Sequence, residues 1–388
     1  MKKDRIKISD FAEVITGGTP STSNPEYWDS GNIPWLQSGA CQNDVITKCD
    51  TFITQKGLDN SAAKMMKPGS VLIALTGATT GKVGYLTFDA CANQSVTGIQ
   101  PNERFVSKYL YYYLRGIRPK ILNDSYGGAQ KHISQGYVKN IEVPLGPVEQ
   151  QVKIAKEFEV IDTIIALRRQ ELHQFDDLIK ARFVEMFGDP VRNEMEWQTK
   201  ALEDVCKSIV DCPHSTPSYT SEDTGFMCIR TSIVKKNRII WDEIEYIPEE
   251  EYIQRIQRKK PERGDVIYTR EGAILGIAAV IDRDCNVALG QRSMLLSPNR
   301  SFCTPEFISV AMNFDSFLDN ALKGLSGSAS PHINVGDIKS FNMILPPVEQ
   351  QEAFSAFVAQ IEKSKSVIQK SLDETQLLFD SLMQEYFG

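Results

Sequence analysis

The five residues Pro-Val-Glu-Gln-Gln occur twice in the chain, at 147–151 and at 347–351, each time just before a stretch with a helical pattern. The segment HISQGYVKNIEVPLGPVEQQ (132–151) aligns without a gap on HINVGDIKSFNMILPPVEQQ (332–351), and the offset of 200 persists to the Phe-Gly pairs at 187–188 and 387–388. A gap-free register over 57 residues indicates an internal duplication. The chain is therefore expected to fold as two similar halves.

The upstream parts of the two copies also correspond, with offsets that drift as loops of different length require. The segment PGSVLIALTGATTG (68–81) lies on RGDVIYTREGAILG (263–276) at an offset of 195, and Gln94 lies on Gln291 at an offset of 197. Short β-rich runs at 71–75, 266–269 and 278–281 alternate with Gly-, Thr- and Asn-rich turns, and helices are expected at 107–114 and 305–312. Because strands and helices do not alternate regularly, we expect a mixed α/β (α+β) fold and not a doubly wound sheet.

The duplication divides the chain into four predicted segments. Its 388 residues exceed what one typical core holds, which also predicts two domains. We expect globular domains at 1–146 and 191–346, and helical segments at 147–190 and 347–388.

Both helical segments carry apolar residues at alternating steps of four and three, the pattern of one long helix packing along another. Eight of ten positions in this series are apolar in each copy, and no Pro or Gly interrupts the pattern before Gly188 or Gly388. Each helix would span roughly 50 Å, longer than its domain needs, which favours mutual packing over separate docking of each helix on its own domain. A pseudo-twofold permits a parallel or an antiparallel pair, and an antiparallel pair would place the globular halves at opposite ends of a rod. The residues predicted to pack are Ile154, Phe158, Ile161, Ile165, Leu172, Phe175, Ile179, Phe354, Val358, Ile361, Ile368, Leu372, Phe379 and Leu382.

Composition indicates an ordinary globular protein of the cytoplasm. No stretch approaches eighteen consecutive apolar residues, and the basic start MKKDRIKISDF lacks the apolar core of a signal peptide. Eight cysteines include no Cys-x-x-Cys pair and only four histidines are present, so no zinc site is predicted and the thiols are interpreted as reduced and mostly buried.

No catalytic motif is complete. The segment TGATTGKVG (76–84) resembles a phosphate loop, but three residues instead of four separate Gly77 from Gly81, and Val83 stands where Ser or Thr is required. The chain contains no Gly-x-Ser-x-Gly, no His-Glu-x-x-His and no Asn-Pro-Pro-Tyr sequence. His132 and His332 recur with the repeat and are interpreted as structural. These absences favour a recognition protein over an enzyme.

With the repeat and the paired helices in place, the chain resembles the specificity subunit of a type I restriction–modification enzyme over its full length. The resemblance is carried by PLGPVEQQ and LPPVEQQ before the helices and by MFGDP at the end of the first helix. ISDFAEVITGGTP (8–20) and ALEDVCKSIVDCPHSTP (201–217) resemble the openings of two target recognition domains, and PGSVLIALTGATTGKVG resembles their glycine-turn segment.

The resemblance implies a non-catalytic subunit whose two target recognition domains each read one half of an asymmetric, bipartite sequence in double-stranded DNA. It implies that the two helices pack antiparallel, set the spacer between the half-sites and dock two methyltransferase subunits. Motor–nuclease subunits would complete the enzyme. This chain would bind no cofactor, and S-adenosylmethionine, Mg and ATP would be held by the partner subunits.

Polar and basic loop residues are the candidates for contact with base edges, because Arg, Lys, Asn, Gln, Ser and Thr recognise bases in the grooves. The cluster Lys235–Arg238 is the strongest basic one, whereas 255–260 (RIQRKK) follows three glutamates and is interpreted as a solvated helix face. The candidates are Thr16, Gly18, Thr19, Thr22, Gln37, Lys82, Gln94, Gln130 and Lys131 in the first copy, and Arg230, Lys235, Lys236, Arg238, Arg270, Gln291, Arg292 and Ser330 in the second.

The net charge of −7 predicts weak binding to DNA by the chain alone, because affinity for duplex DNA rests on neutralised phosphates. Only residues 1–144 have a basic excess, with 16 basic and 12 acidic groups. The segments 28–44 and 222–238 are dissimilar, which predicts two different half-sites and a non-palindromic target.

Three other interpretations compete with this one. The chain could be a nuclease–methylase fusion that modifies DNA by itself, although the methyltransferase motifs are missing. It could be a coiled-coil adaptor without DNA recognition, or a silent variant from a locus that exchanges recognition domains by recombination.

Overall fold

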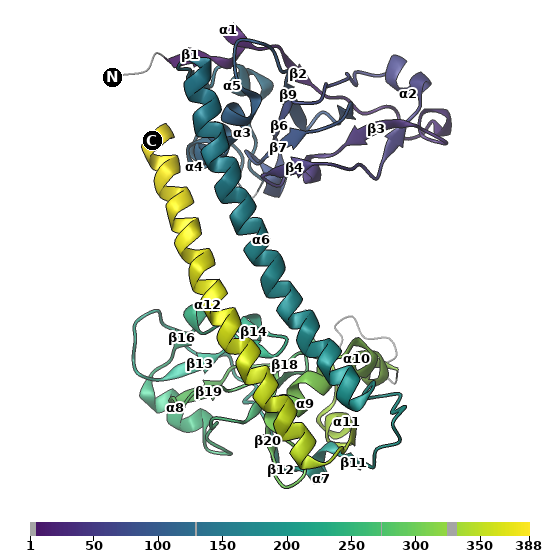
Figure 1. The fold of residues 1–388 in the computed structure, drawn as a ribbon, viewed down its shortest axis with the longest axis vertical. Coiled ribbons are helices and arrows are strands. Elements are labelled where there is room, and N and C mark those ends of the chain that lie inside the picture. Colours follow the sequence, from purple (N-terminus) through teal and green to yellow (C-terminus); the bar gives the residue numbers. More distant parts are fainter. Residues whose placement is uncertain (1–4, 129, 273, 324–331) are drawn as a thin grey trace. The chain divides into compact units, whose positions relative to one another are not determined.

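The computed structural model describes residues 5–388 apart from 129, 273 and 324–331 (Figure 1). The chain forms two compact units. The first unit comprises Met1–Arg169 together with Lys370–Gly388, and the second unit is the continuous stretch Gln170–Gln369. Each long helix therefore contributes to both units. This grouping differs from the four segments expected from the sequence, whose bounds remain a prediction.

The globular part of the first unit, here called the first module (residues 5–146), is a mixed α/β structure built on a five-stranded sheet. The strand order is β2-β9-β6-β7-β4, antiparallel except for the pair β4–β7. The strands of this sheet are β2 (Val14–Thr16), β4 (Asp44–Ile46), β6 (Val71–Ala74), β7 (Val83–Leu86) and β9 (Val96–Ile99). A second sheet contains β3 (Ile33–Leu36), β5 (Phe52–Ile53) and β8 (Cys91–Ala92), and β1 (Arg5–Lys7) pairs with β10 (Glu142–Pro144). The helices are α1 (Ile8–Phe11), α2 (Gln55–Asp59), α3 (Ser107–Gly116), α4 (Arg118–Asp124) and α5 (Gln135–Lys139), with 3-10 turns at Pro25–Tyr27, Ser38–Ala40 and Gly77–Thr79.

The second module (residues 191–346) repeats this plan with a four-stranded sheet in the order β12-β20-β17-β18. Its strands are β12 (Cys206–Asp211), β17 (Val266–Thr269), β18 (Ala278–Val280) and β20 (Ser293–Pro298). The smaller sheets contain β13 (Met227–Ile229) between β16 (Glu245–Tyr246) and β19 (Val287–Leu289), β14 (Val234–Lys235) with β15 (Arg238–Ile239), and β11 (Thr199–Ala201) with β21 (Asn342–Ile344). The helices are α7 (Leu202–Val205), α8 (Glu249–Arg255), α9 (Pro305–Met312), α10 (Asp315–Leu322) and α11 (Val335–Lys339), with 3-10 turns at Thr231–Ile233 and Trp241–Glu243.

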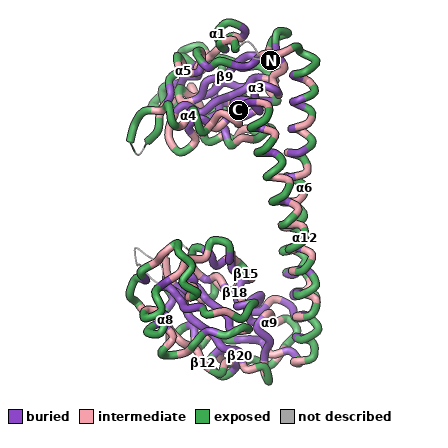
Figure 2. The backbone as a smooth tube through the Cα atoms, turned by 90° about the vertical axis from the view of Figure 1, so that its left-hand side faces the viewer, coloured by how far each residue is buried: buried purple, intermediate pink, exposed green. Residues whose placement is uncertain are grey.

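The core of each unit lies between the sheet and the helices, where the central strands are buried (Figure 2). The strands β6 and β17, which run through the middle of the two main sheets, have no exposed residue. The helices α3 and α9 are buried along most of their length beside them. By contrast, the long helices α6 (Val148–Phe187) and α12 (Val348–Phe387) alternate between buried and exposed residues.

Within each unit the two long helices run antiparallel and meet through aromatic side chains. In the first unit Phe158, near the start of α6, lies 5.2 Å from Phe379 and 5.7 Å from Phe387 between ring centroids. In the second unit Phe354, near the start of α12, lies 5.5 Å from Phe183. The fourteen residues that the sequence predicted to pack are all buried or half-buried. The antiparallel alternative is thus the one that the fold adopts.

Polar residues that interrupt the apolar pattern find partners on the opposite helix. In the first unit the Arg168 guanidinium donates to the carbonyl of Ser371 and to the hydroxyl of Thr375. In the second unit the Lys365 ammonium, 6 % exposed, lies 2.7 Å from a carboxylate oxygen of Asp176. Such pairs are satisfied only in one register, so they favour that register over a slipped one.

The second glutamine of each Pro-Val-Glu-Gln-Gln has the same structural role in both copies. The side-chain oxygen of Gln151 accepts a hydrogen bond from the backbone N–H of Val106 at the start of α3 (2.9 Å), and its amide donates to the loop before α6 (2.9 Å). Gln351 does the same with Thr304 at the start of α9 (3.1 Å) and with the loop before α12 (2.8 Å). Both glutamines are at most 1 % exposed. Each glutamine therefore connects the start of a long helix to the preceding module by hydrogen bonds.

A search of the described part of the chain for a helix long and apolar enough to cross a membrane finds none.

Candidate nucleic-acid interface

Loops of the first module that are far apart in the sequence are connected by backbone hydrogen bonds and form one surface, here called the first face (17–19, 36–37, 75–82, 93–95 and 130–133). The connecting bonds run from the N–H of Gly17 to the carbonyl of Val96 (3.0 Å), from Asn93 to Leu36 (2.8 Å), from Leu75 to Ser95 (2.8 Å) and from Ile133 to Leu75 (2.9 Å). Most of the first-module candidates therefore lie on neighbouring loops.

The second module contains the same four bonds at the corresponding positions, and the loops that they connect form the second face (212–217, 229–232, 270–277, 290–292 and 332–333). These bonds run from Cys212 to Ser293 (3.2 Å), from Gly290 to Ile229 (2.8 Å), from Arg270 to Arg292 (3.0 Å) and from Ile333 to Arg270 (2.8 Å). They align residue 93 with 290 and residue 75 with 270, the same offsets of 197 and 195 that the sequence indicated. The two faces are thus one scaffold with different side chains.

On the first face the candidate side chains are mostly neutral and exposed. The Thr19 hydroxyl donates to the side-chain oxygen of Gln94, and Gln37 lies exposed at the end of β3. Lys131 is exposed while its carbonyl accepts from the N–H of Gly77 (3.1 Å), which attaches residues 130–133 to the glycine turn.

The other first-module candidates have different surroundings. Thr16 is half-buried and its hydroxyl contacts that of Thr97 (2.9 Å), whereas Gly18 is buried where a Cβ would lie 2.4 Å from the carbonyl carbon of Ala62. Gly18 therefore serves the packing of the turn. The Lys82 ammonium donates to the side chain of Gln42 (2.6 Å), while the candidates Thr22 and Gln130 are exposed.

On the second face a buried ion pair holds the loops together. Arg270, 7 % exposed, makes two contacts with the carboxylate of Asp211, from Nε to Oδ1 (3.0 Å) and from Nη2 to Oδ2 (3.2 Å). The same carboxylate lies 3.1 Å from Nε2 of the exposed His214, whose carbonyl accepts from the Gln291 amide (2.5 Å). Arg270 and Gln291 thus fix the loop that begins at residue 212.

A small concavity of the second face gathers three of the candidates. Its volume is about 240 Å³, and its lining includes Arg230, Gln291 and Arg292 around Tyr219. Nε of Arg230 lies 2.9 Å from a carboxylate oxygen of Glu245, and its guanidinium carbon lies 5.2 Å from the centre of the Tyr219 ring. Arg292 is exposed and has a φ of 66°, a left-handed conformation that is uncommon for a residue other than glycine. This concavity is the most basic part of the second face.

The basic cluster at 235–238 divides between two surfaces. Lys235 donates to the carbonyl of Ser232 (2.7 Å), beside the concavity, whereas Lys236 pairs with Asp315 at the start of α10 (2.9 Å). The hydrogen bond from the Lys236 ammonium lowers the pKa of the Asp315 carboxyl below its ordinary value. Arg238 lines a different cavity, described next, and Ser330 lies outside the described residues.

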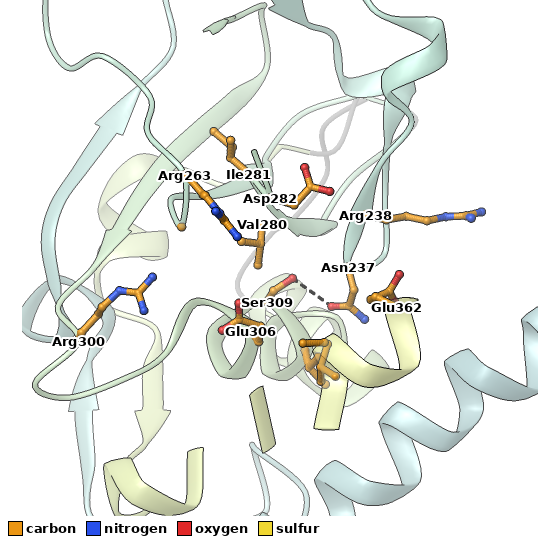
Figure 3. Close-up of a pocket in the computed structure, with 14 residues that line it drawn as sticks. Asn237, Arg238, Arg263, Val280, Ile281, Asp282, Arg300, Glu306, Ser309 and Glu362 are labelled. Atoms are coloured by element: carbon orange, nitrogen blue, oxygen red, sulfur yellow. Dashed lines mark hydrogen bonds between the residues drawn. The ribbon is translucent and has the colours of Figure 1, made fainter. Parts of the chain in front are cut away.

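A cavity of about 610 Å³ lies beside Arg238 in the second module (Figure 3). Its lining includes Val280, Ser309, whose hydroxyl contacts Asn237 (3.0 Å), and Glu362 from α12. In the first module Tyr85 and Tyr111, with ring centroids 6.2 Å apart, stand at the repeat positions of Val280 and Ser309. Sequence reasoning gave no indication of this difference.

The stretch 255–260 is not the solvated helix face that its charge pattern suggested. The helix α8 ends at Arg255, which is 7 % exposed, pairs with Glu251 (2.9 Å) and donates to the carbonyl of Ser215 (2.9 Å). Arg258 donates to the carbonyl of Asp211 (3.3 Å). The buried Arg255 therefore stabilises the loop 212–217 of the second face. A charge pattern alone does not reveal this role.

Sequence reasoning also missed an exposed aromatic residue beside the first face. Tyr126 is 63 % exposed, its backbone pairs with His132, and the two ring centroids lie 5.9 Å apart. The recurrence of histidine at 132 and 332 was a signal for this place, since both residues pair with the glycine-turn segment, at Thr76 and Glu271.

Comparison with known proteins gives a consistent result. Residues 2–175 and 194–375 each match the family model described as type I restriction modification DNA specificity domain. The chain is 24 % identical over 410 residues to the type I restriction enzyme MjaIX specificity subunit of Methanocaldococcus jannaschii, covering 98 % of this chain and 91 % of the relative. It is 21 % identical over 408 residues to the EcoKI specificity subunit of Escherichia coli, covering 97 % and 86 %. The crystal structure of a type I restriction–modification S subunit from M. genitalium superposes with a TM-score of 0.55 at 14 % identity, covering 99 % of this chain and 96 % of that one, which is a likeness of fold.

Proposed function

Because the chain belongs to the family of type I restriction–modification specificity subunits, with two copies of its domain, we propose that each module recognises one half of a bipartite, asymmetric sequence in double-stranded DNA. The first face would contact one half-site and the second face the other. The chain supplies the choice of sequence, and partner subunits supply the chemistry.

One observation carries this proposal. The two faces share their backbone hydrogen bonds and differ in the side chains that these backbones present. Base edges are distinguished by side chains, and phosphates by position and charge. A common scaffold with dissimilar side chains is therefore suited to two different half-sites and to a non-palindromic target.

The proposal includes two methyltransferase subunits, each docked on one of the long helices. Leu167 and Leu178 are 59 % and 45 % exposed on α6, and their repeat equivalents Val367 and Leu378 are 64 % and 50 % exposed on α12. Eleven residues are close to three helical turns, so each pair lies on one side of its helix. These exposed apolar side chains are available for contact with a partner protein. Two equivalent surfaces favour two copies of one partner.

The net charge of −7 fits this division of labour. A chain with little positive charge to offer neutralises few phosphates, so its own affinity for DNA should be low and steeply dependent on salt. We expect partner subunits to close around the duplex and to hold S-adenosylmethionine, Mg and ATP, with motor–nuclease subunits joining for cleavage. The helices would set the spacer between the half-sites, and an inserted helical turn should change that spacer.

The test is long-read detection of modified bases in a host without other methylases, expressing the chain together with the methyltransferase encoded beside it. Methyladenine in one bipartite, non-palindromic motif, lost when either protein is omitted, is the expected result. A stable complex with the methyltransferase that leaves the DNA unmodified and binds all duplexes equally would favour an adaptor without sequence recognition.

A further inference from the structure

One position has the same backbone setting on both faces and carries a different side chain on each. Gln37 follows β3 and Arg230 follows β13, with φ and ψ of −102° and 166° for Gln37 and of −87° and 152° for Arg230. Each of these residues directly precedes a 3-10 turn, and the carbonyl just before it accepts the equivalent bond from Asn93 or Gly290 (2.8 Å in both). The two side chains therefore leave corresponding points of the two modules.

The Arg230 side chain is held in one orientation. Its Nε lies 2.9 Å from the Glu245 carboxylate, and the face of Tyr219 lies against its guanidinium. The side chain is still 42 % exposed. With Nε facing the Glu245 carboxylate at ion-pair distance, the two terminal nitrogens remain as a planar pair of donors, and such a fork matches O6 and N7 of guanine in the major groove.

The Gln37 side chain offers different chemistry at the corresponding point. It is exposed, and within the described residues no side chain forms a hydrogen bond with its amide. A carboxamide presents one donor direction and one acceptor, the pair that matches N7 and N6 of adenine.

We propose that this position determines base specificity in both modules, with Arg230 selecting a guanine in one half-site and Gln37 an adenine in the other. The inference rests on the proposed function, because it assigns bases to faces that are proposed to contact DNA. It goes further by naming the residue and the base for one position in each half.

The experiment uses the full complex of this chain with its methyltransferase and the motif determined by long-read sequencing. Arg230→Gln should relax one fixed guanine of the wild-type motif towards adenine and leave the remaining bases unchanged, with a loss of discrimination of roughly 5- to 150-fold. The matched control is Arg283→Gln. Arg283 also lies on an aromatic ring, 4.4 Å from the centre of Trp241, with its Nε 3.2 Å from Asp282, away from the second face.

The reverse substitution, Gln37→Arg, is made in the first module together with a carboxylate to pair with the new arginine. Thr51, which accepts a bond from Trp35 (2.9 Å), stands where Glu245 stands beside Cys228. The double variant Gln37→Arg, Thr51→Glu should therefore replace one adenine by guanine, in the half that Arg230→Gln leaves unchanged. A wild-type motif unaltered in Arg230→Gln, or both variants altering the same half, would overturn the proposal.

A measurement on the wild-type complex covers the case in which a variant fails to assemble. Replacing each guanine of the target motif in turn by 7-deazaguanine removes its N7 acceptor, and at the guanine that Arg230 contacts, binding measured by fluorescence anisotropy should weaken by several-fold to tens of fold, on the order of a single base contact. Undiminished binding of every substituted duplex would overturn the assignment of Arg230. Failure of the wild-type complex to distinguish any duplex sequence would instead overturn the proposed function itself.

Discussion

In the first module Gln37 and Leu75 occupy the places that Arg230 and Arg270 occupy in the second, although the backbone bonds around them are the same. The first face is mostly neutral, and its loops are held by hydrogen bonds and by packed glycine turns. The second face is held by a buried ion pair and carries fixed arginines. The comparison teaches that the duplicated scaffold constrains the path of the chain while leaving the exposed chemistry free to diverge.

The largest expected effects come from removing an aromatic side chain of one long helix, which should destabilise one unit and leave the other unchanged. Phe158→Ala should lower the free energy of unfolding of the first unit by about 3–5 kcal/mol, because Phe158 is fully buried against Phe379 and Phe387. Phe354→Ala should do the same to the second unit. Hydrogen exchange measured by mass spectrometry would show which unit loses protection, with the exposed Phe52→Ala as control. Equal loss in both units from either variant would contradict the division.

The ion pair of the second face can be converted to the residues of the first. Arg270→Leu leaves the Asp211 carboxylate without its buried partner. It should therefore lower the free energy of unfolding by about 3–5 kcal/mol. Adding Asp211→Thr, which gives the second module the residues found at 16 and 75, should recover most of that loss because no unpaired charge remains. Denaturant unfolding of the single and double variants provides the cycle. If the two substitutions instead lower the free energy of unfolding additively, the stability of the second module would not depend on pairing these two charges.

The outer sides of the long helices should bind equivalent partners. Leu178→Asp and Leu378→Asp each place a charge in one proposed docking surface, which should weaken binding there by about tenfold or more and leave the other surface intact. Native mass spectrometry should then find one methyltransferase subunit per chain instead of two. Loss of both subunits from one substitution would mean that the surfaces are not independent.

The smallest expected effects distinguish a charged contact to DNA, made by Lys131, from an uncharged one, made by Tyr126. Lys131→Ala should reduce the salt dependence of DNA binding by about one unit of slope, the effect of one phosphate contact. Tyr126→Ala should weaken binding without changing that slope, because an exposed ring contributes contact and neutralises no phosphate. Binding titrations at several salt concentrations measure both, and Lys56→Ala, whose ammonium pairs with Glu26 in the same module, is the control. If all three variants show the same salt dependence, Lys131 does not contact a phosphate.

Much of the fold followed from the sequence because the duplication provides two observations of each element. The strand at 266–269 and the helix at 305–312 have the predicted bounds, and Gln94 and Gln291 occupy equivalent places. The choice between parallel and antiparallel helices remained open because a pattern of apolar steps is the same in both directions.

The chemistry of the candidate faces could be predicted far less well. The partner of Arg270 is 59 residues away, and that of Arg230 lies on a separate strand. A charged loop residue looks the same in the sequence whether it is exposed or paired below the surface. The roles of Gly18 and Arg255 were missed for the same reason, because burial depends on segments that only tertiary packing brings together.

The membership of Lys370–Gly388 in the first unit has a consequence for synthesis. The ribosome makes the chain from its N-terminus, so all of the second unit, Gln170–Gln369, exists before the segment that closes the first unit. Until then the nascent chain exposes the aromatic side of α3, against which Phe387 packs at 5.4 Å from both Tyr109 and Tyr113. Contacts between such distant parts of a sequence form slowly. The half of the protein that is translated first therefore cannot complete its packing until the last residues of the chain have been made.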